Sequence, residues 1–95
     1  MVTKVILERK LEAYFSAACK KRSLLTLKLN VRFARGWPDR IVPLKSGGVL
    51  WVELKRPGGK LSALQEKVHK DLFNLGHDVY VIDSKEGIDR VLGTA

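Results

Sequence analysis

Hydrophobic residues near the start of the chain recur at the spacing of a helix. Within residues 4–22 the intervals between apolar positions are mostly three or four, at Leu7, Leu11, Tyr14, Phe15, Ala18 and Cys19. This spacing places them on one stripe of an amphipathic helix. The segment ends in Lys20, Lys21 and Arg22, cations that suit the partial negative charge of a helix C-terminus. The pattern predicts a first helix with Cys19 as a small buried side chain.

The next segments alternate between apolar and polar residues or form short apolar runs. In "LLTLKLNVRF" (24–33) one side of the alternation is Leu25, Leu27, Leu29, Val31 and Phe33. Strict alternation is typical of a half-buried strand, and these five side chains are expected to face the core. "RIVPLK" (40–45) and "GVLWVELK" (48–55) predict two further strands, joined by a hairpin turn at residues 46–48.

The last third of the chain predicts two helices around one strand. Ser62 suits the N-cap of a helix that ends at Leu75 before Gly76. "DVYVID" (78–83) reads as a fourth strand and "SKEGIDRVL" (84–92) as a short terminal helix. The apolar side of the longer helix would consist of Ala63, Leu64, Val68, Leu72, Phe73 and Leu75.

The predicted order is therefore α-β-β-β-α-β-α. The two hairpin strands should be antiparallel, whereas the third and fourth strands, joined across a helix, should be parallel. The sequence thus predicts an α/β fold in which a mixed sheet of about four strands is flanked by helices.

Composition narrows the class of protein. Ninety-five residues, 45% of them hydrophobic, suit one globular domain spanning residues 1–95. The single cysteine excludes an intrachain disulfide. No apolar run approaches the ~18 residues of a membrane span, and no signal-peptide pattern is present. We therefore expect an intracellular protein without a membrane partner.

The charge balance points to a polyanionic partner. Lys and Arg number 18 against 10 Asp and Glu, which gives a net charge of +8. An excess of this size in a short chain favours nucleic acid, whose phosphate backbone is the commonest polyanion.

Three charged residues lie in the segment "GWPDRIVPLKSGGVLWVELK" (36–55), which otherwise reads as two buried strands. They are Asp39, Glu53 and Lys55. If the turn is a three-residue loop at 46–48, Asp39 stands opposite Lys55 and Ile41 opposite Glu53. Directly opposed residues, and residues two apart on one strand, share a face of the sheet, so the three charged side chains converge. A two-residue turn would shift the register by one and separate them.

Two neighbouring carboxylates form an oxygen-rich site suited to Mg²⁺ or Mn²⁺. Such an ion can polarise a phosphoryl oxygen, and a nearby ammonium can orient an attacking water or stabilise charge on phosphorus. Asp39, Glu53 and Lys55 thus supply the parts of a metal-dependent phosphodiesterase. From spacing alone the alternative is an ordinary cross-strand ion pair, Asp39 with Lys55 or Arg40 with Glu53.

A family resemblance strengthens the first interpretation. Pro38-Asp39 followed by Glu53-Leu54-Lys55 matches the P-D…(D/E)-x-K signature of the restriction-endonuclease-like nuclease superfamily. The stretches "GWPDR", "WVELKRPGGKLSALQ" and "LGHDVYVID" resemble the virus-type replication–repair nuclease (VRR-NUC) domain over about residues 8–92. The resemblance implies a restriction-endonuclease-like core and a small stand-alone protein of phage type, active in the cytoplasm of the bacterial host.

The resemblance also implies roles for individual residues. Asp39 and Glu53 would hold Mg²⁺ or Mn²⁺, together with the backbone carbonyl of Leu54. Lys55 would be the catalytic lysine, and Gln65, on the following helix, would support the active centre. No small-molecule cofactor is implied.

The family also carries a glutamate on its first helix. Glu8 and Glu12 both fit, because they lie four residues apart on one helix face, and Glu12 is preferred because it lies deeper in the helix. The family glycine corresponds to Gly36, which would let the chain turn into Asp39. Relatives often have a glycine-rich lead-in where this chain has the bulkier "VRFAR" (31–35).

The resemblance implies a DNA endonuclease in which an activated water attacks phosphorus in line and leaves 5′-phosphate and 3′-hydroxyl ends. The expected substrate is a Holliday junction or a flap, and the expected assembly is a homodimer, since one active centre cuts one strand. The alternatives are a basic nucleic-acid-binding module without catalysis and a phage assembly protein. Contacts to DNA are expected from Arg40, Lys60, Ser62, Lys20, Lys21, Arg22 and Arg56.

Three further residues have no assigned chemistry at this stage. Trp37 is expected to be an exposed or dimer-packing aromatic, with a wedge between DNA bases as the alternative. His69 is expected on a helix surface and His77 in a turn.

Overall fold

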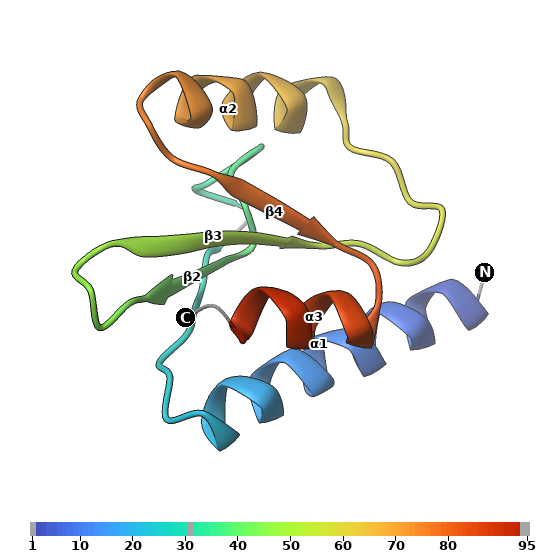
Figure 1. Cartoon of the computed structure of the whole chain (residues 1–95). Helices are drawn as coiled ribbons and strands as arrows, with labels where there is room; N and C mark the ends of the chain where they lie inside the picture. Colours follow the sequence, from blue (N-terminus) through green and yellow to red (C-terminus); the bar gives the residue numbers. More distant parts are fainter. Residues whose placement is uncertain (1, 31, 94–95) are drawn as a thin grey trace.

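A computed structural model describes residues 2–30 and 32–93, with side chains from Leu7 onward. The order of its elements confirms the predicted α-β-β-β-α-β-α arrangement (Figure 1). The elements are α1 (Val2–Lys21), β1 (Leu27–Lys28), β2 (Arg40–Pro43), β3 (Val49–Leu54), α2 (Ala63–Asn74), β4 (Val79–Ile82) and α3 (Lys85–Leu92).

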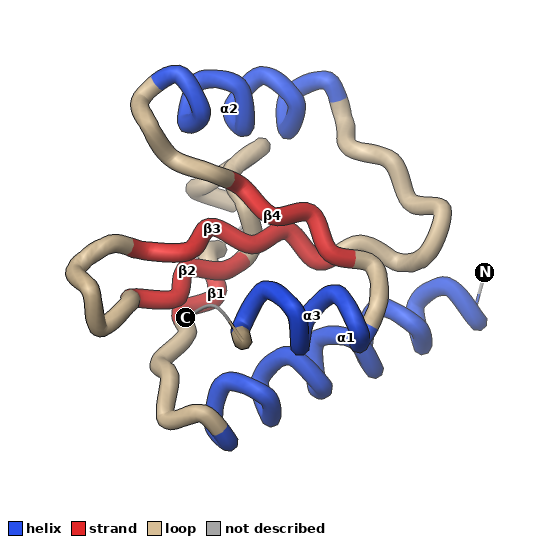
Figure 2. The backbone as a smooth tube through the Cα atoms, in the orientation of Figure 1, coloured by secondary structure: helices blue, strands red, loops and turns tan. Residues whose placement is uncertain are grey.

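The strands form one mixed sheet in the order β1-β2-β3-β4. β1, β2 and β3 pair antiparallel, and β3 pairs with β4 in parallel, as expected for strands joined across a helix. Figure 2 shows α1 and α3 together on one side of this sheet and α2 on the other. The sheet therefore has one well-covered face and one face covered by a single helix.

The core lies between the sheet and the α1–α3 pair. The buried positions of α1 are Leu11, Phe15, Ala18 and Cys19, which confirms the predicted helical stripe and the buried cysteine. On β3 every second residue faces them, and from α3 come Ile88 and Leu92; the strand residues in this core are Val42, Leu50, Val52, Leu54 and Ile82. Because strand side chains alternate, Trp51 and Glu53 point to the α2 side.

The predicted ten-residue strand at 24–33 was wrong, because among its described residues only Leu27 and Lys28 pair with β2. Leu25 and Phe33 are 78% and 88% exposed, and Val31 lies outside the described residues. The chain turns away at Asn30, whose carbonyl accepts from the backbone N–H groups of Phe33 and Ala34. The alternation was present, but β1 is an edge strand, and Leu25 and Phe33 stay exposed.

The N-cap of α2 was predicted correctly, and its apolar side was not. Ser62 and Gln65 form a reciprocal capping box that satisfies backbone N–H groups at the start of the helix. Of the predicted apolar side chains only Leu72 is buried, while Phe73 and Leu75 are 67% and 76% exposed. Local capping thus defines where the helix begins, although little of the helix is buried. None of the described helices is long and apolar enough to cross a membrane.

Candidate active site

The β2–β3 hairpin turns through a three-residue loop, one residue earlier than predicted. Leu44 N–H donates to Gly48 O at 2.8 Å, and Gly47 N–H donates to Leu44 O at 3.0 Å. The loop is therefore residues 45–47 instead of 46–48. Gly47 takes a φ of +103°, which side-chain-bearing residues rarely adopt, so it belongs inside the turn.

This displacement changes the predicted pairs but preserves the face. Arg40 pairs with Val52 and Ile41 with Trp51, so continuing the register places Asp39 opposite Glu53. The expected pairs of Asp39 with Lys55 and of Ile41 with Glu53 were wrong. Moving a three-residue loop by one residue moves the partners by two positions, and a shift of two keeps every side chain on its original face.

The residues predicted for catalysis and metal binding line one cavity of about 240 Å³ at the end of this hairpin. Its lining combines the first helix, the ends of β2 and β3, and the first turn of α2. The lining residues are Glu8, Glu12, Lys28, Asp39, Glu53, Leu54, Lys55 and Gln65. The structure thus gathers the carboxylates, the lysine and the glutamine that the sequence singled out, and it adds Lys28 from β1.

Asp39 is held rigidly at the entrance to β2. Its Oδ2 accepts a hydrogen bond from the backbone N–H of Leu54 at 3.2 Å, and its carbonyl accepts from Leu29 N–H at 2.7 Å. The backbone that leads into Asp39 depends on Gly36, which has a φ of +80°. A Cβ at this glycine would lie 2.6 Å from Leu64 Cγ on α2, so the chain passes too close to α2 for any side chain.

Glu53 is a buried carboxylate without adequate compensation. The residue is 2% exposed, and no described residue forms a hydrogen bond with its Oε1. Burial is the main cause that raises its pKa to about 8, followed by hydrogen bonding to Asp39 and the negative charge of Asp39. The ammonium of Lys55 lowers the pKa, and Glu8 raises it slightly. Among the described residues, the Lys55 ammonium therefore offsets only part of the cost of burying this carboxylate.

His69 lies beside this carboxylate, contrary to the expected place on a helix surface. Its side chain is 10% exposed, and its Nε2 lies 3.8 Å from Glu53 Oε1. Burial lowers its pKa, which favours the neutral imidazole. The sequence signal that could have located it is its position four residues after Gln65, on the same face of α2.

The two candidate glutamates of α1 have different surroundings. Glu12 Oε1 lies 2.6 Å from Lys28 Nζ and 4.0 Å from a guanidinium nitrogen of Arg40. Glu8 forms no hydrogen bond or ion pair within the described part of the chain, and its charge acts on Glu53. Glu12 is thus neutralised by cations, whereas the carboxylate of Glu8 borders the cavity without one.

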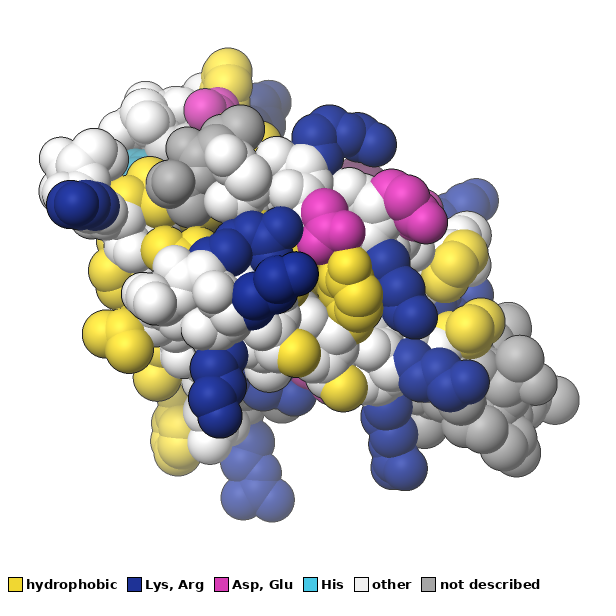
Figure 3. Space-filling model, turned by 60° about the horizontal axis from the view of Figure 1, so that its bottom comes forward, with side chains coloured by type: hydrophobic (Ala, Val, Ile, Leu, Met, Phe, Trp, Pro, Cys, Tyr) yellow, Lys and Arg dark blue, Asp and Glu magenta, His cyan; other side chains and the backbone are white. Residues whose placement is uncertain are grey.

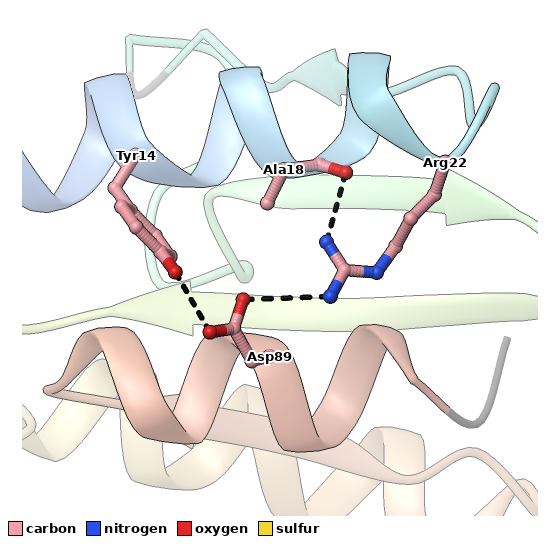
Figure 4. A network of polar contacts seen from close by, with 4 residues as sticks. All are labelled: Tyr14, Ala18, Arg22 and Asp89. Atoms are coloured by element: carbon pink, nitrogen blue, oxygen red, sulfur yellow. Dashed lines mark hydrogen bonds and ion pairs between the residues drawn. The ribbon is translucent and has the colours of Figure 1, made fainter.

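The cations expected to bind DNA are not all equally accessible. Arg40 is buried, with its guanidinium carbon 5.6 Å from the centre of the Phe15 ring. Arg22 pairs with Asp89 at 3.4 Å, and Tyr14 donates to the same carboxylate at 2.7 Å (Figure 4). These contacts tie α1 to α3, well outside the lining of the cavity.

The remaining predicted contacts lie closer to the site or on the surface. Lys20 and Lys21 are exposed at the end of α1, and Lys60 is exposed in the loop that follows β3. Arg56 is half-buried in that loop, and the Ser62 hydroxyl is occupied by the N–H of Gln65 at 3.1 Å. Figure 3 shows Lys and Arg side chains spread over the visible α1–α3 side instead of gathered at one point.

The two remaining aromatic predictions concern the α2 side of the sheet. Trp37 is 42% exposed and lies 5.6 Å from Trp51, centre to centre. His77 follows α2 in a turn, as expected, and its Nδ1 accepts from Trp51 Nε1 at 3.3 Å. Trp37 is therefore an exposed aromatic that packs partly on the sheet.

The oxygen donors at the cavity fit a hard divalent cation. Asp39, Glu53 and the carbonyl of Leu54 are the donor types that Mg²⁺ and Mn²⁺ prefer. A cation there would compensate the charge that burial otherwise opposes on Glu53. Among the described side chains, no three Asp, Glu, His or Cys residues form a cluster that could hold a metal ion. Any ion would therefore need backbone or solvent oxygens as well.

Comparisons with known proteins agree with this geometry. No family model matches the chain. It is 36% identical over 83 residues to "Putative nuclease p44" of Acyrthosiphon pisum secondary endosymbiont phage 1. The matched region covers 87% of this chain and 89% of the phage protein. A solved structure described as "VRR_NUC domain" superposes with a TM-score of 0.80 at 25% identity, covering 92% of this chain and 95% of that one.

Proposed function

Because this chain belongs to the VRR-NUC family of nucleases, we propose that it is a divalent-metal-dependent endonuclease that hydrolyses phosphodiester bonds in branched DNA. One observation carries the proposal. Asp39, Glu53 and Lys55 meet at one cavity, and Oε1 of the buried Glu53 has no hydrogen-bond partner among the described residues. If Glu53 belonged to a structural ion pair, this oxygen would have a cation as its partner. We propose that residues 1–95 work as one nuclease domain.

The residues of the cavity would have different chemical roles. Asp39, Glu53 and the Leu54 carbonyl would hold Mg²⁺ or Mn²⁺, which when bound polarises a phosphoryl oxygen and lowers the pKa of a water. Lys55 lines the same cavity. There its ammonium can donate a hydrogen bond to the attacked phosphate and stabilise the charge that develops on that phosphate. In-line attack would leave 5′-phosphate and 3′-hydroxyl ends.

We assign the first-helix role to Glu8 instead of Glu12. A carboxylate that assists the reaction must be free to accept a proton or a hydrogen bond from water. Lys28 already occupies Glu12 at 2.6 Å, whereas Glu8 borders the same cavity. Gln65 contributes through the capping box, which fixes the start of α2 beside the site.

The substrate class follows from charge and from the family. A net charge of +8 favours DNA held through its phosphates, with strong salt dependence and little sequence preference. Lys20, Lys21 and Lys60 are the exposed cations among the predicted phosphate contacts. Junctions and flaps are the proposed substrates, and a phage-infected bacterial cytoplasm is the proposed location.

We propose that the working form is a homodimer. Phe73 and Leu75 at the end of α2 are 67% and 76% exposed, and Val81 on the edge strand β4 is 48% exposed. Large apolar side chains exposed at the end of a helix and on an edge strand are candidates for an interaction surface. Analytical ultracentrifugation of the wild type and of Phe73→Asp tests this, with the wild type sedimenting as a dimer and the variant as a monomer.

The nuclease activity is tested on three labelled substrates: a four-way junction, a flap and a plain duplex, each with Mg²⁺, Mn²⁺ or EDTA. We expect metal-dependent cleavage of a branched substrate, and its loss in Lys55→Ala. Lys45→Ala is the matched control, because Lys45 lies exposed in the hairpin turn. Cleavage by Lys55→Ala at the wild-type rate would remove the assigned role of that lysine. Binding of DNA without any cleavage or any Mn²⁺ binding would instead identify a non-catalytic nucleic-acid-binding module.

A further inference from the structure

Two buried polar atoms that face each other have no hydrogen-bond partner within the part of the chain that the structure describes. They are Nε2 of His69 on α2 and Oε1 of Glu53 on β3, which lie 3.8 Å apart. The two side chains are only 10% and 3% exposed. Buried polar atoms in folded proteins nearly always have a partner, so an opposed pair without one calls for a specific explanation.

The separation is close to that of a hydrogen bond. An N–H···O bond has a donor–acceptor distance of about 2.9 Å, so a displacement of about 1 Å by either side chain would form it. The charged groups around the pair are Asp39 before β2, Lys55 after β3 and Glu8 on α1. None of these supplies a hydrogen-bond donor to Oε1 in the structure. The imidazole of His69 is therefore the group placed to do so.

We propose that His69 is a positioning residue for Glu53, whose Oε1 accepts a hydrogen bond from His69 Nε2–H after a shift of about 1 Å by either side chain. This proposal rests on the proposed nuclease function. It leaves Oε2 of Glu53 as the oxygen available to a cation. Asp39 is held in the same way, since its Oδ2 accepts from the N–H of Leu54 at 3.2 Å. Each of the two carboxylates would then have one oxygen oriented by the protein.

The energetic reason is the usual one for groups that support metal ligands. A buried carboxylate with one free oxygen can rotate, and fixing it before the cation arrives removes that freedom. Partners of this kind typically affect metal affinity or activity by about 10–100-fold. His69 touches neither the DNA nor the cation in this proposal, so it is not itself a catalytic residue.

The test compares three substitutions at this position. His69→Gln keeps an N–H donor at nearly the reach of Nε2, His69→Asn keeps the amide but is too short, and His69→Leu removes the donor. His77→Gln is the matched control, because His77 is an exposed histidine outside the cavity. Calorimetric titration with Mn²⁺ in the absence of DNA measures the affinity directly, and circular dichroism establishes that each variant is folded.

We expect Mn²⁺ affinity to fall by about 10–100-fold in His69→Leu and His69→Asn, and to stay near wild type in His69→Gln and His77→Gln. Cleavage assays should show the loss in kcat, with little change in the KM for DNA. A merely structural histidine would lower the unfolding midpoint without changing the Mn²⁺ affinity of the folded chain. Wild-type affinity in a folded His69→Leu or His69→Asn would overturn the proposal; if His69→Leu does not fold, His69→Asn against His69→Gln decides.

A second readout needs no metal and no activity. In the ¹⁵N spectrum of the imidazoles of the metal-free chain, Glu53→Gln should shift the Nε2 resonance of His69 and leave that of His77 unchanged. An unchanged His69 signal would show that the two side chains are not coupled, which also overturns the proposal. If the wild type neither binds Mn²⁺ nor cuts DNA, the proposed function fails, and this spectrum still decides the His69–Glu53 contact.

Discussion

Replacing Glu53 by glutamine should stabilise the metal-free protein while abolishing its cleavage of DNA. The carboxylate is 2% exposed, and burial with neighbouring Asp39 raises its pKa from 4.5 to about 8. Glutamine has almost the same shape, carries no charge and can still donate a hydrogen bond to Asp39. The substitution therefore removes the cost of burying the negative charge and leaves the packing intact.

The sign and size of the effect follow from the pKa. A carboxyl whose pKa is higher in the folded state loses its proton first in the unfolded chain, so the free energy of unfolding falls as pH rises from about 4.5 to about 8. Each pH unit in that window corresponds to about 1.4 kcal/mol. At pH 7 the wild type should thus be less stable than Glu53→Gln by up to about 3 kcal/mol, with less when Asp39 shares the proton.

Urea denaturation in EDTA, followed by tryptophan fluorescence at pH 5, 7 and 8.5, measures this difference. The two proteins should have similar stability at pH 5 and differ most at pH 8.5, since the variant lacks the titrating group. Saturating Mn²⁺ should stabilise the wild type and not the variant. Parallel curves for both proteins across this pH range would refute the reasoning, because Glu53 would then carry no buried-charge penalty.

Three further predictions concern the scaffold. Gly36→Ala should destabilise the protein by at least about 1–3 kcal/mol in urea denaturation, because φ is +80° and a Cβ would meet Leu64 Cγ at 2.6 Å; Gly47→Ala, with open space around it, should cost less. Ser62→Ala removes the cap of α2 and should cost about 1 kcal/mol, and wild-type stability would contradict the capping role. Asp89→Asn should lower the pKa of Tyr14 toward 10.0, since hydrogen bonding to Asp89 is the largest cause that raises it; absorbance titration of the phenols checks this, and an unchanged titration would contradict it.

Much of the site could be predicted because its determinants are local in sequence. The alternation along residues 48–55 puts Glu53 and Lys55 on one face, and the odd length of the hairpin loop puts Asp39 on that face too. The predicted loop position was off by one residue, yet the face survived because the pairing moved by two positions. The face of the sheet on which each side chain lies is therefore unchanged by this error. The identity of the directly opposed residues, in contrast, depends on where the turn closes.

His69 could not be assigned in the same way. Its burial depends on how α2 lies over the sheet, and α2 buries only Leu72 of its predicted apolar side. Helical periodicity shows which residues share a face, and it does not show which face meets the sheet. The choice between Glu8 and Glu12 is of the same kind, since Lys28 on β1 reaches Glu12 only in the folded chain.

The sequence by itself determined the order of the elements, the buried stripe of α1, the cap at Ser62 and, apart from Lys28, the residues around the cavity. These features depend on the spacing of apolar residues, on the alternation of side chains along a strand and on helix capping, all of which involve a few neighbouring residues. Only the tertiary structure decided that the strand at 24–33 shrinks to Leu27 and Lys28, and that His69 meets Glu53. The physical reason is that the burial of a side chain depends on which distant element packs over it. An apolar pattern in one segment does not show whether such an element is present.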